Sequence, residues 1–301
     1  MWIWKNRAEI DVIEWDKYLQ HSSSQQIELS SWYLDIVAQH WGAFYHKASG
    51  ARIPVAYHTK WIFIKQVYRP AFIQQMNIIS QNTLDVKDRL KLIQTIKQKF
   101  PCGQFNSGLT ITDSKIRKNY VLSLISYNQQ GVQLFSAHHR KEIVLASSKN
   151  LNIQLSNQIE VFIDHFQTFS LSKLGHSGIE KHLLEQLILS SLNKENGILL
   201  MVFDESSQPL AGAFFQSYKR RLVYLMSYTN PEGKKKNAMY GLLKYVFDHY
   251  KDTHDVFDFE GSDIPGIQFF FEGFGATLQN YSEWIWRDHF MCKLYHRFRI
   301  G

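Results

Sequence analysis

Three apolar runs between residues 197 and 229 constrain the fold of this chain more than any other feature. They cover 197–204, 210–218 and 222–229, and short polar turns separate them. The turns, SSQP at 206–209 and KRR at 219–221, are too short for a crossover connection. Neighbouring runs must therefore pair as antiparallel hairpins. The sequence predicts a three-stranded antiparallel meander.

A basic loop, a helix and a fourth strand are predicted to follow this meander. The loop covers Pro231–Lys236. Beyond it, apolar residues recur at the spacing of one helical stripe: Met239, Leu242, Leu243, Val246, Phe247 and Tyr250. The next run, Val256–Glu260, alternates between apolar and acidic residues, which predicts a strand with Asp258 and Glu260 on one face.

This order of elements resembles the core of the GNAT acyltransferases. The segment FDFEG at 257–261, followed by IQFFFEGFGA at 267–276, is similar to the Fem-type branch of that superfamily, the FemAB- and FemX-like peptidyl transferases. In that branch a strand ending Asp-Phe-x-Gly precedes a helix and a Phe-Gly-Ala turn. The resemblance implies an α+β fold of two tandem GNAT-like halves, each a mostly antiparallel mixed sheet flanked by helices.

The first part of the chain repeats the layout of the second, which predicts an internal duplication of architecture. Helices are expected at 11–19 and 32–40, strands at 42–48, 53–59, 60–67 and 71–79, then a helix at 83–100 and a strand at 101–106. Later we expect strands at 119–127, 151–155 and 277–287, and helices at 136–149, 159–169 and 178–191. The predicted halves are 1–130 and 131–301, with the tail 289–301 packing back on the first half.

The composition favours a folded protein that binds anions. Hydrophobic residues make up 45% of the 301 residues, and the net charge is +7. A basic balance suits coenzyme A, a nucleotide-linked sugar, tRNA or an anionic membrane surface. The basic residues are spread along the chain, which argues against a duplex-DNA footprint. The sequence contains no apolar run of about 20 residues and no recognisable signal peptide, so we expect a cytoplasmic protein without a transmembrane segment.

The acyl donor is expected to bind where GNAT enzymes hold the pyrophosphate of acyl-CoA. That role needs amide donors at a helix N-terminus, where the helix dipole favours anions. The resemblance assigns it to eight residues, with the main chain near Met226 and Tyr228 polarising the acyl carbonyl. The predicted binding residues are Met226, Tyr228, Gly233, Lys234, Lys235, Lys236, Asn237 and Ala238.

Three residues are candidates for proton transfer. Asp258 or Glu260 could act as the general base toward an amine, and Tyr228 as the general acid toward a leaving thiolate or ribose hydroxyl. The alternative is structural: the carboxylates pair with basic side chains, and the tyrosine lies at the edge of the core. The histidines show no HExxH or Cys/His ligand spacing, so no metal is expected.

The resemblance implies transfer of an acyl or aminoacyl group from acyl-CoA or aminoacyl-tRNA to an amine, as in bacterial cell-wall synthesis. A non-catalytic ligand-binding protein on a degenerate GNAT fold is the alternative. It is favoured by the single Gly233, where the family has a glycine pair, and by Phe271, where the family has a lysine. An RNA-associated protein that uses its basic loops is a third possibility.

Overall fold

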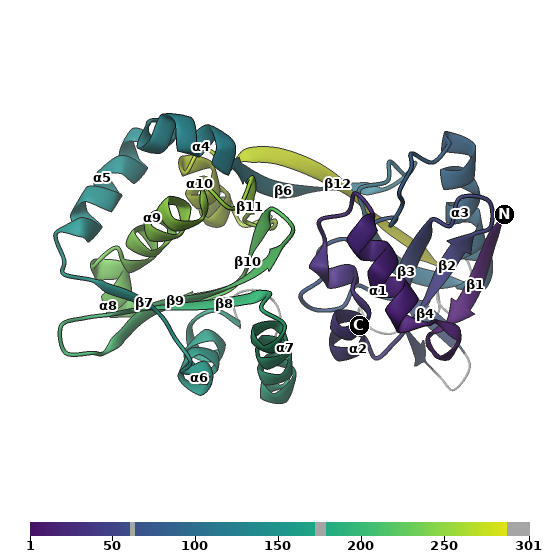
Figure 1. Cartoon of the computed structure of the whole chain (residues 1–301), viewed down its shortest axis with the longest axis horizontal. Coiled ribbons are helices and arrows are strands. Elements are labelled where there is room, and N and C mark those ends of the chain that lie inside the picture. Colours follow the sequence, from purple (N-terminus) through teal and green to yellow (C-terminus); the bar gives the residue numbers. More distant parts are fainter. Residues whose placement is uncertain (61–63, 172–178, 288–301) are drawn as a thin grey trace, which may run out of the picture. The chain divides into compact units, whose positions relative to one another are not determined.

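The chain divides into two compact units in the computed structural model, which describes residues 1–60, 64–171 and 179–287. Unit 1 contains Met1–Arg117 and the chain from Asn280 onward, and unit 2 contains Lys118–Gln279. The division falls inside β6 (Lys115–Ser123) and β12 (Thr277–Arg287), which Figure 1 labels. The predicted boundary after residue 130 coincides with the end of a helix in unit 2, and the predicted tail 289–301 lies outside the described residues.

Unit 1 is built on a mixed sheet with the strand order β1-β2-β3-β4-β5-β12. Neighbouring strands are antiparallel except β4 and β5, which are parallel. The strands are β1 (Trp2–Asn6), β2 (His40–His46), β3 (Arg52–Lys60), β4 (Ile64–Val67) and β5 (Cys102–Ser107), with β12 as above. The helices are α1 (Val12–His21), α2 (Ser31–Val37) and α3 (Val86–Lys99), with short 3-10 turns at Arg7–Glu9 and Ile27–Leu29.

In unit 2 the strand order is β6-β11-β10-β9-β8-β7, and this part of the sheet is also mixed. Among the strand pairs of its described residues, only β10 and β11 are parallel. The strands besides β6 are β7 (Asn152–Leu155), β8 (Gly197–Phe203), β9 (Pro209–Tyr218), β10 (Arg221–Thr229) and β11 (Val256–Asp258). The helices are α4 (Leu124–Gln130), α5 (Ala137–Ser147), α6 (Ile159–Phe169), α7 (Lys181–Asn193), α8 (Pro231–Lys235), α9 (Ala238–Tyr250) and α10 (Pro265–Gly273), and Gly131–Leu134 is a 3-10 helix.

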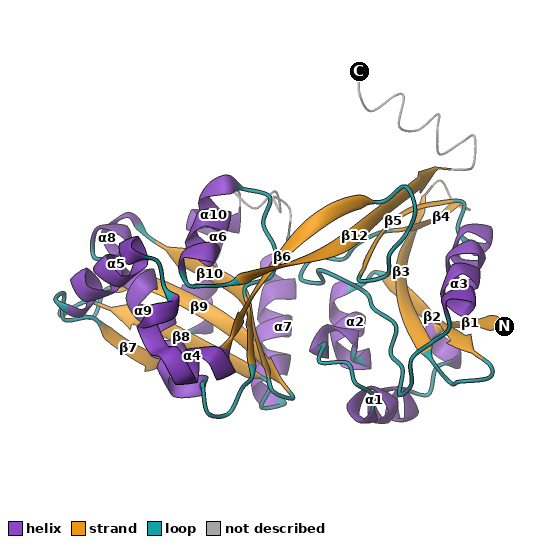
Figure 2. Cartoon of the chain, turned by 90° about the horizontal axis from the view of Figure 1, so that it is seen from above, coloured by secondary structure: helices purple, strands orange, loops and turns teal. Residues whose placement is uncertain are grey.

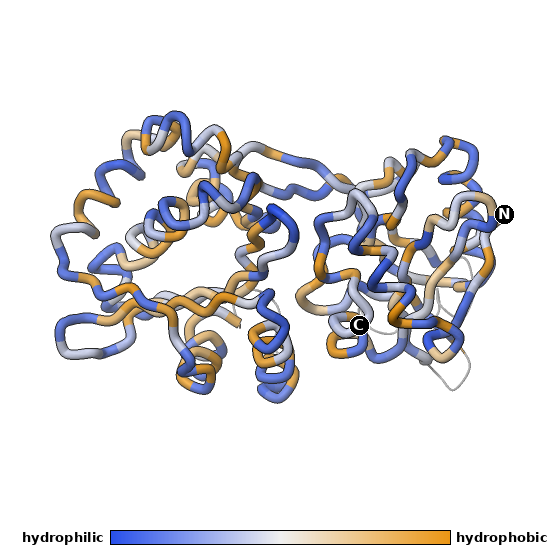
Figure 3. Tube along the Cα trace, in the orientation of Figure 1, coloured by the Kyte–Doolittle hydropathy of each residue, from blue (hydrophilic) through white to orange (hydrophobic). Residues whose placement is uncertain are grey.

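Helices cover both faces of the sheet in unit 2. Helices α5 and α9 lie over one face, and α6 and α7 lie over the other (Figures 1 and 2). Strands β8 and β9 are therefore buried along nearly their whole length, and Figure 3 shows their hydrophobic character. Continuous apolar runs are what a strand with two covered faces requires, which is why the meander carries the strongest signal in the sequence.

The predicted meander and the helix after it are confirmed. β8, β9 and β10 pair as antiparallel hairpins, and the predicted apolar stripe of α9 contributes five buried residues to the core, four of them fully buried. Both units have the predicted mixed α+β architecture, in which an antiparallel meander leads through a helix to a parallel strand.

Four local predictions are wrong. The stretch predicted as a basic loop is helix α8, and β11 ends at Asp258, so Glu260 is outside the strand. The predicted strand at 71–79 contributes only an isolated bridge between Ile79 and Arg52. Residues 124–127, expected to extend a strand, begin α4, because the side chain of Ser123 caps the amide of Ser126 and starts the helix.

Candidate functional site

The parallel pairing of β10 and β11 stops halfway along β10. The two strands pair from Arg221 opposite Val256 to Val223 opposite Asp258. β11 ends there, whereas β10 continues through residues 224–229 with β9 on its other edge. In the described parts of the chain, no strand lies beside the edge of 224–229 that faces β11. We call this the open edge of β10; such an edge presents N–H and C=O groups that can bind an extended ligand.

A β-bulge at Leu225 decides which way the side chains of the open edge point. The register with β9 shifts there by one residue. Before the bulge, Tyr224 faces α9, where its hydroxyl lies 3.3 Å from Sδ of Met239. Beyond it, Tyr228 packs against Phe162 of α6, with ring centroids 5.7 Å apart. Residues four apart in a regular strand share a face, so the bulge turns Tyr228 to the opposite face of the sheet.

The hydroxyl of Tyr228 has no hydrogen-bond partner among the described residues. The side chain is 1% exposed, and burial raises the pKa of its phenol, so the group stays protonated at neutral pH. An unpaired buried hydroxyl costs about 1–3 kcal/mol, and such groups call for an explanation. A ligand that accepts a hydrogen bond from Tyr228 would remove this cost, so the residue remains a candidate general acid.

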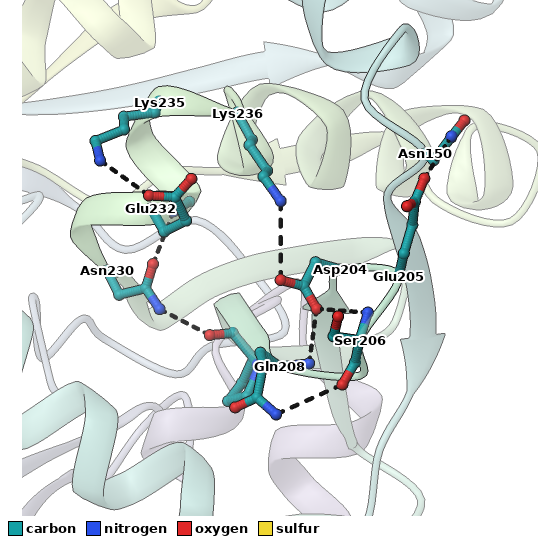
Figure 4. A network of polar contacts seen from close by, with 11 residues as sticks. Asn150, Asp204, Glu205, Ser206, Gln208, Asn230, Glu232, Lys235 and Lys236 are labelled. Atoms are coloured by element: carbon teal, nitrogen blue, oxygen red, sulfur yellow. Dashed lines mark hydrogen bonds and ion pairs between the residues drawn. The ribbon is translucent and has the colours of Figure 1, made fainter.

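Helix α8 is held against the β8–β9 hairpin by its own N-cap (Figure 4). Oδ1 of Asn230 accepts the amide of Gly233 at 2.7 Å, and its Nδ2 donates to the carbonyl of Pro209 at 2.7 Å. A Cβ atom on Gly233 would lie 2.3 Å from the carbonyl oxygen of Leu210, so only glycine allows this approach. The amide of Gly233, predicted to bind a donor, is therefore bonded inside the protein.

Two of the three lysines predicted to bind the donor lie in surface ion pairs. Lys235 pairs with Glu232 at 3.0 Å, and Lys236 pairs with Asp204 of the β8–β9 turn at 3.8 Å (Figure 4). Lys234 is exposed. An exposed pair such as Lys235–Glu232 contributes about 0–1 kcal/mol, so an anionic ligand can replace that carboxylate at little cost.

The N-terminus of α9 provides main-chain donors after α8. Asn237 precedes the helix in a left-handed conformation, with φ of 55°. Its carbonyl accepts the amides of Tyr240 and Gly241, while Ala238 is buried at the first helical position. The first amides of a helix have no acceptor within the helix and carry partial positive charge. The amides of Ala238 and Met239 are thus the candidate donors toward an anion.

Asp258 is engaged inside the protein rather than presented to a substrate. It is 2% exposed and forms an ion pair with Arg221, the first residue of β10 to pair with β11. Its Oδ1 accepts the amide of Glu260 at 2.8 Å. Glu260 has φ of 57°, which turns the chain out of the strand, so the predicted common face of the two carboxylates is wrong. Asp258 is the last residue of β11 and belongs to its last pair with β10.

Unit 1 has the same strand arrangement, but its own chain bonds to β5 beyond the parallel pair of β4 and β5. β4 and β5 pair in parallel over two residues each. Beyond them, the amide of Met76 donates to the carbonyl of Asn106 in β5 at 2.9 Å. Oδ1 of Asn77 accepts the Ser107 hydroxyl at 3.0 Å and the Gly108 amide at 2.6 Å. Because β12 pairs with the other edge of β5, residues 76–77 lie along the edge of β5 that faces β4, across from the edge of β4 that is equivalent to the open edge of β10.

His165 was not predicted as a site residue, although it packs beside Tyr228 with ring centroids 5.0 Å apart. The sequence carried one signal. His165 falls on the aromatic stripe of α6 formed by Phe162, Phe166 and Phe169, at offsets of 0, 3, 4 and 7. A half-buried histidine on an otherwise apolar stripe marks a position where a polar group faces the sheet.

Residues 1–60, 64–171 and 179–287 contain neither a cluster of metal-ligating side chains nor a helix that could span a membrane. No group of three or more His, Cys, Asp or Glu side chains in these ranges is placed to hold a metal ion. None of the helices in them is long and apolar enough to cross a membrane.

Comparison with known proteins identifies the fold through structure alone. No family model matches the sequence, and no curated protein matches it. Solved structures do match over nearly the whole chain. The structure of FemX superposes with a TM-score of 0.69 at 10% identity, covering 92% of this chain and 96% of FemX.

Two other solved structures have the same fold. The C-terminal domain of a putative lysylphosphatidylglycerol synthetase from Agrobacterium fabrum gives a TM-score of 0.58 at 14% identity, covering 97% of this chain and 96% of that domain. N-myristoyltransferase from Saccharomyces cerevisiae with bound myristoyl-CoA gives 0.51 at 13% identity, covering 95% of this chain and 79% of the enzyme. The chain therefore has the GNAT-like fold of FemX, as the resemblance in its sequence predicted.

Proposed function

We propose that unit 2 binds an activated acyl donor along the open edge of β10 and transfers its acyl or aminoacyl group to an amine. One observation carries this proposal: β10 and β11 separate after Val223 and Asp258, and the unpaired edge leads through α8 to the N-terminus of α9. Main-chain groups near Met226 would polarise the carbonyl. The amides that open α9 and the lysines of α8 would hold the anionic part of the donor.

The names of the similar structures support this reaction class. One is a lysylphosphatidylglycerol synthetase domain, and another is a transferase that holds myristoyl-CoA. The shared chemistry is an activated carbonyl, an ester in aminoacyl-tRNA or a thioester in acyl-CoA. Tyr228, which burial keeps protonated, would donate to the departing oxygen or sulfur. From the resemblance alone, we also propose a cytoplasmic reaction on a cell-wall precursor.

A binding function without catalysis is the second candidate, and Phe271 favours it. This residue stands where the Fem-type pattern has a lysine, and it is 6% exposed. Its ring packs on Phe259 with centroids 4.7 Å apart. The position therefore belongs to the hydrophobic core, and any charge stabilisation that the family's lysine supplies must come from another group in this chain.

Thermal unfolding with a panel of donors tests the proposed function. Acetyl-CoA, myristoyl-CoA and tRNA charged with lysine are compared with free CoA and uncharged tRNA. A donor at about 100 times its Kd should stabilise the protein by about 2.7 kcal/mol, or about 5 °C or more. Mass spectrometry should then detect the acyl group on an added amine. Stabilisation without transfer would favour the binding protein, and no stabilisation by any donor would refute both candidates.

A further inference from the structure

We propose that His165 of α6 accepts the proton that an amine must lose before it attacks the donor carbonyl. The inference rests on the proposed function and names a residue that this function did not include. It starts from a requirement of the chemistry. An aliphatic amine is an ammonium ion at neutral pH, and its nitrogen has no lone pair for attack until a base removes a proton.

The position of His165 is set by the packing of α6 on β10. Its ring lies 5.0 Å from the ring of Tyr228 and 5.7 Å from that of Phe169, measured between centroids. The side chain is half-buried, whereas its neighbours Phe162 and Phe166 on the same stripe are buried. His165 is thus the titratable side chain of α6 that contacts Tyr228, at the open edge of β10.

A main-chain hydrogen bond fixes the tautomer of His165. Nδ1 lies 2.8 Å from the carbonyl oxygen of Val161. A carbonyl can only accept, so Nδ1 carries the hydrogen and the neutral ring keeps its lone pair on Nε2. This bond also holds the ring orientation, as a general base requires.

Asp258 and Tyr228 are excluded as the base by their surroundings. Both carboxylate oxygens of Asp258 are occupied, one by Arg221 and one by the amide of Glu260. The phenol of Tyr228 has a raised pKa and cannot accept a proton at neutral pH. The histidine and the tyrosine thus divide the two roles, one taking a proton and the other providing one.

The transfer balances without a metal or a redox partner. Nε2 takes one proton from the ammonium, and the amine lone pair attacks the carbonyl carbon. The new C–N bond forms as the C–O or C–S bond of the donor breaks. The leaving oxygen or sulfur takes the proton of the Tyr228 hydroxyl. The second proton that the attacking nitrogen loses then returns to the oxygen of Tyr228. The imidazolium of His165 releases its proton to water. The products are the amide, a free alcohol or thiol, and one proton.

The chain provides a matched control in His249 of α9. Its Nδ1 lies 2.9 Å from the carbonyl of Tyr245, the residue four before it, and its ring stacks on Tyr245 with centroids 3.7 Å apart. His249 is exposed and lies on a different helix from His165. The two histidines share the same backbone bond and an aromatic neighbour, but only His165 lies beside Tyr228.

Single-turnover transfer from acetyl-CoA and from lysyl-tRNA tests the role with two acceptors. In solution at neutral pH, ethanolamine is protonated, whereas hydroxylamine is largely unprotonated. For His165→Gln we expect transfer to ethanolamine to slow about 100-fold or more. In His165→Gln, transfer to hydroxylamine should change less than about threefold, and stabilisation of the protein by the donor should be unchanged. His249→Gln should match the wild type in each assay. Equal losses with both acceptors, or no loss in His165→Gln, would overturn the proposal while leaving the transferase function in place.

Histidine ¹⁵N NMR gives a readout that does not depend on turnover. With the hydrogen on Nδ1, Nε2 of His165 should resonate as an unprotonated nitrogen. Its signal should move when ethanolamine is added to the protein with CoA, while the signal of His249 stays fixed. A protonated Nε2, or a His165 signal that saturating ethanolamine leaves unchanged, would also overturn the proposal. Failure of every donor to bind would instead refute the function on which it rests.

Discussion

At the scale of single residues, Gly233 is the tightest point of the candidate site. An added methyl group would meet the carbonyl oxygen of Leu210, a main-chain atom that cannot rotate away. Its amide completes the cap on Asn230. Gly233 therefore serves the close packing of α8 on β9, which sets where α9 begins.

Gly233→Ala should destabilise the protein and weaken donor binding, because α8 must move to admit the methyl group. We expect a loss of about 1–3 kcal/mol in the free energy of unfolding, measured in urea. Gly266→Ala is the matched control: this glycine lies in α10, and a Cβ there would meet nothing within 4 Å. It should leave stability unchanged or raise it by up to about 1 kcal/mol. Equal effects of both substitutions would contradict the packing role of Gly233.

At the scale of elements, the buried His139 joins three helices of unit 2. It belongs to α5, donates from Nε2 to the carbonyl of Phe270 in α10 at 2.9 Å, and lies 5.0 Å from the ring of Tyr240 in α9. Its Nδ1 accepts the hydroxyl of Ser136 at 3.1 Å. Gly273 makes room for the ring, since a Cβ there would lie 1.9 Å from it.

Burial lowers the pKa of His139, which makes stability depend on pH. The unfolded chain takes up the proton more readily, so stability should be constant above about pH 7. It should fall as the pH drops below about 6.5, the ordinary imidazole pKa, toward the lower folded value. One such group contributes at most about 1.4 kcal/mol per pH unit. His254, whose pKa burial also lowers, adds in the same direction.

Urea unfolding at pH 7.5 and at pH 5.5 measures this dependence. His139→Gln should lose part of the difference between the two values, although it is less stable than the wild type at both. The exposed neighbour His138 provides the control, and His138→Gln should keep the full difference. An undiminished difference in His139→Gln would show that another group is responsible.

Elements with strong periodicity were predictable, and those set by local capping were not. The stripe of α9 and the runs of β8–β10 bury their apolar residues as the sequence indicates. α8 was read as a loop because its Pro-Glu-Gly-Lys stretch resembles a turn. It is a helix because Asn230 caps it and a proline occupies its first turn. Glu260 leaves the strand because Asp258 captures its amide, a contact that alternation of residues cannot reveal.

At the scale of the whole molecule, the two units repeat one strand arrangement but differ in what lies beyond their parallel strand pair. In unit 1 the main chain of Met76 bonds to β5, while in unit 2 no strand lies along residues 224–229 within the described ranges. The sequence predicted the duplication from the order of its elements. The sequence could not predict which unit has an open edge, because this depends on where the chain after β4 runs in the folded structure.

We therefore expect one donor site per chain. Isothermal titration of the full chain with the donor that stabilises it should give a stoichiometry of one. Asn77→Ala in unit 1 should leave this stoichiometry unchanged, since the main-chain bond of Met76 remains. Two equivalent sites per chain would contradict the assignment of the site to unit 2.

Because of the bulge at Leu225, the number of residues in β10 decides which face of the sheet Tyr228 occupies. Removing a single codon there would rotate every later side chain of β10 by half a turn and present the phenol of Tyr228 to the layer of α9. A homologous sequence that lacks one residue at this position would still contain every site residue. Its reactive side chains after the bulge would nevertheless lie on the opposite face of the sheet.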